Sequence, residues 1–94
     1  MIPGRVVADE REKASGVPEE LSKLGVRVYF SQLAVGDYVL TPEIAVERKS
    51  VRDLLSSIYD GRIFKQAAML GATYAKPYLL IEGDSKEVKL WRGT

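Results

Sequence analysis

Three charged residues of this sequence are spaced so that they could meet and act on one metal ion: Asp37, Glu47 and Lys49. Asp37 precedes a short strand-like run, residues 38–40, and Glu47 follows a second such run, residues 44–46. The intervening Thr-Pro-Glu sequence is typical of a tight turn. A hairpin with this loop places Asp37 directly opposite Glu47, and the alternation of side chains along a strand places Lys49 on the same face as Glu47.

The chemistry of this trio follows from its charges. Two carboxylates that face each other across a hairpin repel, and a cation between them relieves the repulsion. Carboxylate oxygens suit Mg²⁺, which typically takes one or two carboxylates together with phosphate and water. A bound divalent ion can activate a water and neutralise charge on a phosphodiester, and Lys49 would add a positive charge beside the phosphate. Arg48 is turned to the other face, and a shift of one residue in register would place Arg48 opposite Asp37 and remove the site.

Length and composition narrow the classes of function. The 94 residues make one small domain, with 46% hydrophobic and 29% charged residues, as in ordinary globular proteins. The net charge of +1 provides no general attraction for nucleic acid, so any DNA binding must use a local patch or another module. The sequence has no Cys and no His, which excludes thiolate and imidazole metal sites and His-dependent triads. Without an apolar leader or a membrane-length apolar run, we expect an intracellular protein that does not contact a membrane.

The elements around the hairpin can be read from hydrophobic spacing and turn residues. The second hairpin strand leads through two helices to an apolar strand, which predicts a parallel neighbour joined by a crossover. Because both faces of the hairpin strands are partly apolar, we expect helices on both faces of the sheet. The last strand has the strongest signal for burial, so Leu80 and Ile81 are expected in the core. Further strands are predicted at 5–8, 26–30 and 77–83, helices at 18–25, 50–58 and 63–74, and a polar linker at 13–16.

Other charged residues have two interpretations each. The acidic and basic run 9–12 follows the first strand, where open α/β folds place their chemistry, but it is also compatible with a solvated loop. Asp53 can complete a capping box with Ser50 at a helix start. Arg62 and Gln66 lie on the early turns of the next helix, where they could face a ligand or simply solvent.

The motif over residues 36–53 resembles the signature of the XPF/Hef nuclease family. It reads Gly-Asp, nine intervening residues, Glu-Arg-Lys, three residues, and Asp. An Asp-x-Arg-Glu element at 9–12, Asp-Gly-Arg-Ile-Phe-Lys-Gln at 60–66 and Leu-Ile-Glu-Gly at 80–83 are similar to further segments of that family. The resemblance extends over residues 5–83, and the full set of segments in this order is far more specific than Asp and Glu-x-Lys alone.

The resemblance implies a restriction-endonuclease-like α/β fold with a mixed central sheet, an antiparallel hairpin and helices on both faces. It also implies cleavage of branched DNA, such as 3′ flaps and splayed junctions, in DNA repair and recombination. Mg²⁺ would be the cofactor, with Mn²⁺ as a substitute. Carried over by position, the implied metal ligands are Asp9, Asp37 and Glu47, the catalytic residues are Asp37, Glu47, Lys49, Arg48 and Asp53, and the DNA-binding residues are Arg11, Arg48, Arg62 and Gln66.

The same resemblance sets expectations for the domain and its partners. Residues 1–94 would form one nuclease domain, incomplete at its C-terminus and without the helix-hairpin-helix motifs of the family. A homodimer and a sliding clamp are expected partners of the full-length protein. One alternative is a nuclease-like module that binds DNA or partners without cutting, although such modules typically lose the acids or the lysine that are all present here. The other is an unrelated small α/β domain whose charges are independent and solvated.

Overall fold

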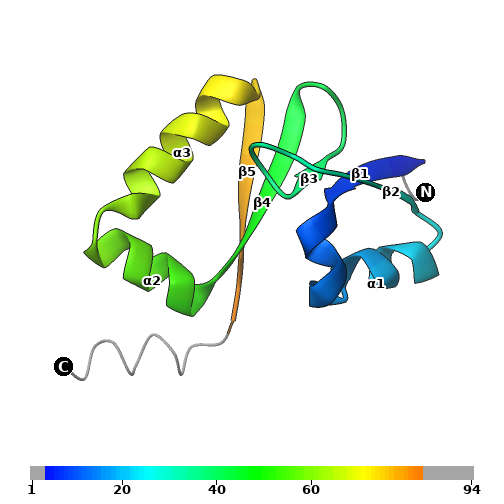
Figure 1. Cartoon of the computed structure of the whole chain (residues 1–94), viewed down its shortest axis with the longest axis horizontal. Helices are drawn as coiled ribbons and strands as arrows, with labels where there is room; N and C mark the ends of the chain where they lie inside the picture. The colour runs from blue at the N-terminus through cyan, green and yellow to red at the C-terminus, as the bar shows by residue number, and fades with distance from the viewer. Residues whose placement is uncertain (1–3, 84–94) are drawn as a thin grey trace.

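Residues 4–83 are described by the computed structural model, and they form one mixed sheet with helices on either side (Figure 1). The strands lie in the order β2-β1-β3-β4-β5, and β4 and β5 are the long central pair in the view. The strands are β1 (Arg5–Asp9), β2 (Arg27–Ser31), β3 (Tyr38–Val39), β4 (Ile44–Ser50) and β5 (Lys76–Glu82). The helices are the 3₁₀ helix η1 (Glu10–Ser15) and the α-helices α1 (Val17–Lys23), α2 (Val51–Tyr59) and α3 (Arg62–Thr73).

The hairpin has the register that the turn predicts. Tyr38 pairs with Val46 in an antiparallel ladder, and the amide of Asp37 donates to the carbonyl of Val46 at 3.0 Å. On its other side β3 runs antiparallel to β1, where the amide of Asp9 donates to the carbonyl of Asp37 at 2.8 Å. Continued by one residue, both registers align Asp9, Asp37 and Glu47 in one row across three strands. The crossover from β4 to β5 gives a parallel pair, as predicted.

Each face of the sheet is covered by different helices, which confirms the expected arrangement. We call the face that carries Ala45, Glu47 and Lys49 the front face, and the face that carries Tyr38 and Arg48 the back face. On the back face α1 packs over a core cluster, whose buried members are Val6, Ala8 and Tyr38. On the front face α3 brings Leu70 and Tyr74 against Gly36 and Ala45. A side chain at Gly36, where φ is +85°, would meet Tyr74 at 3.5 Å.

Helix boundaries follow from local chemistry at each end. The Oγ of Ser50 accepts a hydrogen bond from the amide of Asp53 at 3.0 Å and caps α2, as the sequence predicts. Gly61 is the N-cap of α3 and separates it from α2, with a φ of +83°, a backbone conformation that glycine adopts without a steric penalty. In the part of the chain that the structure describes, no helix is both long and apolar enough to cross a membrane.

Two predictions about local structure are wrong. The expected linker at 13–16 is the end of η1, which begins because the Asp9 carboxylate caps the amide of Arg11. The expected buried strand β5 is exposed along its whole length, and Leu80 retains 52% of its accessible surface. Within residues 4–83, β5 lies at the end of the strand order and has a sheet neighbour, β4, on one side only. An apolar sequence reports the tendency to be buried, and it does not identify the covering element.

Candidate active site

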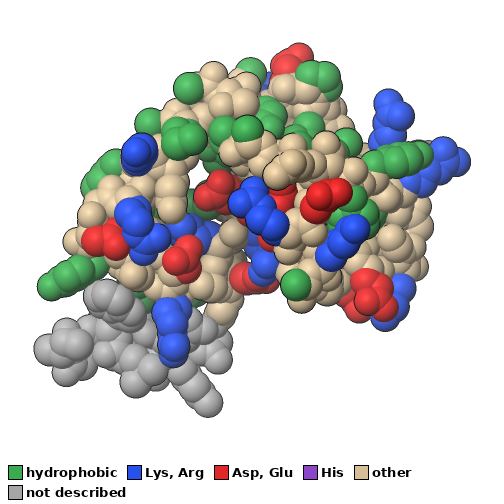
Figure 2. Space-filling view, in the orientation of Figure 1, with side chains coloured by type: hydrophobic (Ala, Val, Ile, Leu, Met, Phe, Trp, Pro, Cys, Tyr) green, Lys and Arg blue, Asp and Glu red, His purple; other side chains and the backbone are tan. Residues whose placement is uncertain are grey.

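A polar cavity of about 400 Å³ opens on the front face, between the hairpin and helices α2 and α3. Acidic and basic side chains gather across this middle region of the molecule in Figure 2. The structure brings together most of the residues that the sequence singled out. The charged and polar residues that line the cavity are Arg11, Asp37, Glu47, Arg48, Lys49, Asp53 and Gln66.

Asp37 and Glu47 form the acidic side of this cavity. Burial raises the pKa of both carboxyl groups above their ordinary values, and the charge of Asp37 raises the pKa of Glu47 further. One oxygen of Asp37 accepts a hydrogen bond from the amide of Arg48 at 2.8 Å. Glu47 has no side-chain hydrogen bond or ion pair with any residue between 4 and 83. Both carboxylates therefore have oxygens free to bind a cation, and their mutual repulsion favours one.

Lys49 lies beside the acids, with only 3% of its side chain exposed. Its ammonium donates to Gln66 Oε1 at 2.7 Å and contacts Asp53 Oδ2 at 2.9 Å. Because one partner comes from α2 and the other from α3, the two helices fix the position of the ammonium. Asp53 therefore takes part in both the helix start and the candidate site. Its amide donates to the capping Ser50, and its side chain holds Lys49.

Arg62 supports the outer side of this arrangement. Its guanidinium makes a 2.8 Å ion pair with Asp60 and lies 4.0 Å from Asp53. The hydrogen bond with Asp60 raises the pKa of Arg62, which stays charged. Arg62 therefore places a half-exposed cation next to the residue that holds Lys49.

Arg48, predicted as both catalytic and DNA-binding, has its guanidinium on the back face of the sheet. There its Nε donates to Glu12 Oε1 at 2.8 Å, and its Nη1 forms an ion pair with Glu82. The hydroxyl of Tyr38 donates to the same oxygen of Glu12 at 2.7 Å. Burial alone would raise the pKa of Glu12, but the hydrogen bonds from Arg48 and Tyr38 outweigh it and lower the pKa. Only the main chain of Arg48 reaches Asp37.

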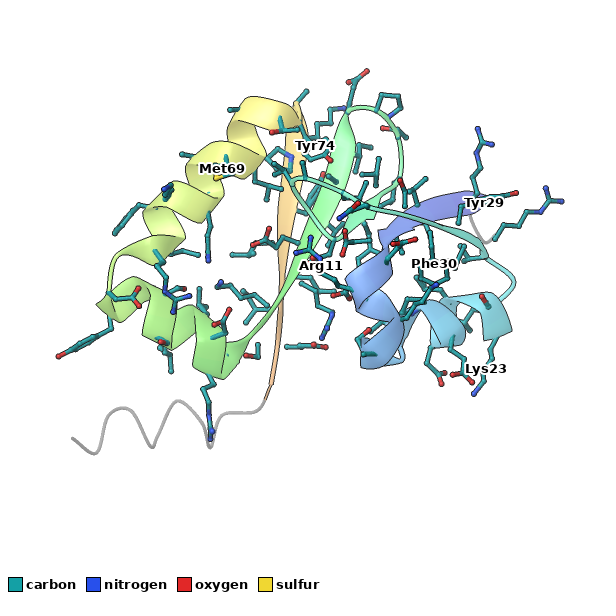
Figure 3. The ribbon with its side chains drawn as sticks, viewed as in Figure 1. Arg11, Lys23, Tyr29, Phe30, Met69 and Tyr74 are labelled. Atoms are coloured by element: carbon teal, nitrogen blue, oxygen red, sulfur yellow. The ribbon has the colours of Figure 1, made fainter. Side chains whose placement is uncertain are left out.

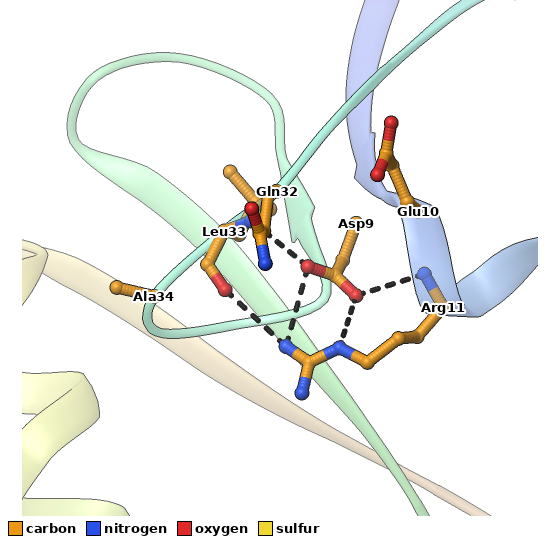
Figure 4. Close-up of a pocket in the computed structure, with 6 residues that line it drawn as sticks. All are labelled: Asp9, Glu10, Arg11, Gln32, Leu33 and Ala34. Carbon is orange, nitrogen blue, oxygen red and sulfur yellow. Dashed lines mark hydrogen bonds and ion pairs between the residues drawn. The ribbon is translucent and has the colours of Figure 1, made fainter.

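Asp9 lies in the same row of the sheet as Asp37 and Glu47, and its carboxylate is held by neighbouring donors. Its carboxylate accepts hydrogen bonds from the Arg11 side chain at 2.7 Å and from the amides of Arg11 and Leu33 (Figure 4). The hydrogen bond from the Arg11 side chain, helped by the Leu33 amide, holds the pKa of Asp9 well below its usual range. Asp9 lines a separate pocket with residues 32–34. Asp9 is therefore the N-cap of η1, and its role as a metal ligand stays a prediction.

Arg11 lies between the two pockets and keeps 78% of its side chain exposed. In Figure 3 its label marks the centre of the molecule, between the helices on one side and η1 on the other. The charge of Asp37 also contributes to raising the pKa of Arg11. Arg11 is thus an exposed, permanently charged donor at the edge of the candidate site.

The donor set can be tested against a metal ion. Among residues 4–83 no three acidic side chains converge closely enough to hold an ion together. Two carboxylates with free oxygens remain, Asp37 and Glu47, and Mg²⁺ commonly binds with one or two carboxylates while water and substrate phosphate complete its shell. The residues present therefore fit Mg²⁺ better than Ca²⁺, which prefers six to eight oxygen ligands.

Sequence reasoning missed the back-face partners of Arg48. The sequence places Glu12 in the charged run 9–12 and Glu82 in the segment 80–83, but it does not indicate that both pair with Arg48 or that the Tyr38 hydroxyl donates to Glu12. The alternation of side chains along each strand does indicate part of this cluster, because it places Tyr38 and Arg48 on the face opposite to Asp37 and Glu47. A partly buried arginine on that face favours a carboxylate partner.

The amino-acid sequence of this chain is similar to a known family and to named DNA repair endonucleases. Residues 8–93 match the family described as the ERCC4 domain. The chain is 54% identical over 85 residues to the 3′-flap repair endonuclease Xpf of Saccharolobus solfataricus, covering 90% of this chain and 36% of that protein. It is 43% identical over 83 residues to the DNA repair endonuclease XPF of Drosophila melanogaster, covering 88% of this chain and 9% of that protein.

Solved structures with the same fold include XPF from Aeropyrum pernix. The free protein matches with a TM-score of 0.82 at 38% identity over 95% of this chain and 46% of the other. The same protein in complex with DNA matches with a TM-score of 0.83 at 38% identity, over 96% of this chain and 48% of the other. This chain thus spans less than half of these solved chains and about a third of the archaeal relative.

Proposed function

Because this chain belongs to the ERCC4 domain family, we propose that it is the catalytic core of a structure-specific DNA endonuclease. The reaction is hydrolysis of a phosphodiester bond in branched DNA, such as a 3′ flap or a splayed junction. The observation that carries the proposal is the front-face cavity, where Asp37 and Glu47 have free carboxylate oxygens and Lys49 is fixed beside them. The names of the relatives supply the substrate class, since one is a 3′-flap repair endonuclease.

The roles of the residues follow from their contacts. Asp37 and Glu47 would hold Mg²⁺, or Mn²⁺ in its place. When bound, such an ion lowers the pKa of a coordinated water and neutralises charge on the phosphate. Lys49 has a fixed ammonium, so it can orient a phosphate oxygen or the attacking water without first reorganising. Asp53 and Gln66 hold that ammonium in place.

DNA contact would use the cations around the cavity. Arg11 is exposed at the junction of the two pockets, and Arg62 is half-exposed beside Asp53. Both can bind backbone phosphates, which position a protein on DNA without reading its sequence. Gln66, predicted to bind DNA, holds Lys49 through its carbonyl oxygen, and its amide N–H groups could donate to a phosphate at the same time. With a net charge of only +1, this domain would rely on other modules for most of its affinity.

The full-length protein would act with partners in the cell. A homodimer would cover part of the exposed apolar surface of β5, and a sliding clamp would be a partner at the DNA. An intracellular site of action follows from a role in DNA repair. None of these features depends on the geometry of the catalytic cavity, so each can fail independently of the nuclease assignment.

A cleavage assay tests the proposal directly. Labelled 3′-flap, splayed and fully paired DNA are incubated with the longest available form of the protein, in Mg²⁺ or in EDTA. We expect cutting of the branched substrates in Mg²⁺ only, and loss of cutting in Asp37→Asn. DNA binding without cutting in any metal would support the alternative, a nuclease-like module that binds without cleaving.

A further inference from the structure

The back face of the sheet carries a hydrogen-bonded cluster that the proposed reaction does not use directly. Glu12, from η1, is buried and accepts hydrogen bonds from the Tyr38 hydroxyl at 2.7 Å and from Arg48 Nε at 2.8 Å. Arg48 also contacts the same carboxylate through Nη2 at 3.4 Å and Glu82 through Nη1. A buried carboxylate is costly unless it is paired, and here the two closest donors, Tyr38 and Arg48, come from different strands, while Ser15 of η1 adds a longer hydrogen bond at 3.5 Å.

These partners are the chain neighbours of the site residues. Tyr38 follows Asp37 on the hairpin, and Arg48 lies between Glu47 and Lys49. Because side chains alternate across a strand, a tie between Tyr38 and Arg48 on the back face also fixes the strand positions that present the front-face carboxylates. Glu12 thus joins the two strands at the level where Asp37 and Glu47 face each other.

The hairpin needs such a tie at this level. The ladder between β3 and β4 includes only Tyr38 and Val39 on the β3 side, so Asp37 lies just beyond the end of the strand. There the amide of Arg48 donates to the Asp37 carboxylate at 2.8 Å. A strand of two residues supplies little cooperativity, and a slip of its end would separate the two acids.

We propose that Glu12 is a positioning residue, which fixes Arg48 and Tyr38 from the back face so that the Arg48 amide and Asp37 stay in place for cation binding. This role rests on the proposed function, since it assigns the cation to Asp37 and Glu47. Glu12 itself does not line the cavity and would touch neither metal nor DNA.

Two variants of the 94-residue chain separate positioning from general stability. Tyr38→Phe deletes only the hydroxyl that donates to Glu12, and Glu12→Gln removes the charge while retaining the shape. Tyr29→Phe, on the exposed strand β2, and Glu20→Gln, on the exposed side of α1, are the matched controls. Amide hydrogen exchange is measured without metal, where opening free energies can be compared residue by residue.

Positioning predicts a local effect. In both variants the Arg48 amide should exchange about tenfold faster relative to amides of the β1–β2 ladder, as expected for loss of one hydrogen bond to a charged group. The controls should leave that ratio unchanged. An equal change across the whole sheet, or an unchanged ratio in Tyr38→Phe, would overturn the proposal even if Glu12→Gln fails to fold.

A second measurement connects the cluster to the site. Mn²⁺ affinity is measured calorimetrically, without DNA, for the wild-type chain and Tyr38→Phe. If Tyr38→Phe binds Mn²⁺ several-fold more weakly than the wild-type chain, the positioning role of Glu12 is supported. Equal Mn²⁺ affinities of the two proteins contradict it. If the wild-type chain binds no Mn²⁺, the proposed metal-dependent function fails, and the exchange measurement still decides whether Glu12 fixes the hairpin end.

Discussion

The amide of Arg48 donates a hydrogen bond to the carboxylate of Asp37 at 2.8 Å, while the Arg48 side chain is bound on the opposite face of the sheet. One residue thereby connects the two faces. On the front face its main chain orients an acid of the candidate site, and on the back face its guanidinium is paired with Glu12 and Glu82. The guanidinium of Arg48 makes its contacts within the fold, and the predicted binding of DNA by Arg48 stays a prediction.

Replacing Asp37 by Asn should abolish metal-dependent cleavage and slightly stabilise the metal-free protein. Loss of a metal ligand removes several kcal/mol of transition-state stabilisation, which is roughly 10³-fold or more in rate. Burial raises the pKa of Asp37, so its charge destabilises the fold at neutral pH, and the substitution should add a fraction of about 1 kcal/mol.

The stability gain of Asp37→Asn should depend on pH. A raised pKa means that the wild-type fold becomes relatively more stable as the pH falls through that pKa and the carboxyl protonates. The difference between the two proteins, measured by urea unfolding, should therefore shrink on acidification. Full cleavage activity in Asp37→Asn would be incompatible with a metal-binding role.

Glu12→Gln should destabilise the protein, whereas Asp37→Asn should stabilise it. The pKa of Glu12 is lowered, so its charged form contributes stability that is present above the ordinary glutamate pKa of about 4.3 and is lost as the pH falls further. At pH 7 the substitution should cost about 1–3 kcal/mol, as for a buried hydrogen bond to a charged group. Denaturant unfolding at pH 7 and at pH 3 checks this, and a cost that grows on acidification would refute the assigned pairing.

Lys49→Ala should slow cleavage about 10²-fold, as for removal of one fixed electrostatic donor, with a much smaller effect on DNA binding. The buried ammonium has a local role, whereas affinity depends on many phosphate contacts. Single-turnover cleavage and DNA titration measure the two effects separately. Lys65→Ala, an exposed lysine of α3, is the matched control. Binding that falls in proportion to rate would reduce Lys49 to a phosphate contact.

Leu70→Ala and Leu80→Ala should differ strongly in stability. Leu70 is the buried residue of α3 and is 6% exposed, so its truncation should cost about 2–5 kcal/mol. Leu80 is about half-exposed, and its truncation should cost less than about 1.5 kcal/mol in the 94-residue chain. Thermal or urea unfolding compares them, and equal large losses would mean that β5 is covered in solution.

The hairpin and the front-face acids were predictable because a three-residue turn fixes the register, and the register fixes which side chains meet. Asp37, Glu47 and Lys49 required nothing more than alternation along two strands. The parallel placement of β5 followed from the crossover rule in the same way.

The remaining features depend on contacts between residues far apart in the chain. Asp9 shares a row with Asp37, but its carboxylate is used by Arg11 and by the Leu33 amide, which no local pattern reveals. Glu12 meets Arg48 across 36 residues of chain. The exposure of β5 depends on which elements cover it, and apolar composition does not carry that information.

The central claim is that Asp37 and Glu47 bind the same ion, and paramagnetic broadening by Mn²⁺ tests it most directly. Substoichiometric Mn²⁺ is added to the isotopically labelled chain, and its amide signals are followed by NMR. We predict that the signals of Asp37, Glu47 and their immediate neighbours broaden first, and that Glu47→Gln suppresses this broadening. Broadening that begins elsewhere, such as at the exposed acids of α1, or that persists unchanged in Glu47→Gln, would contradict the account.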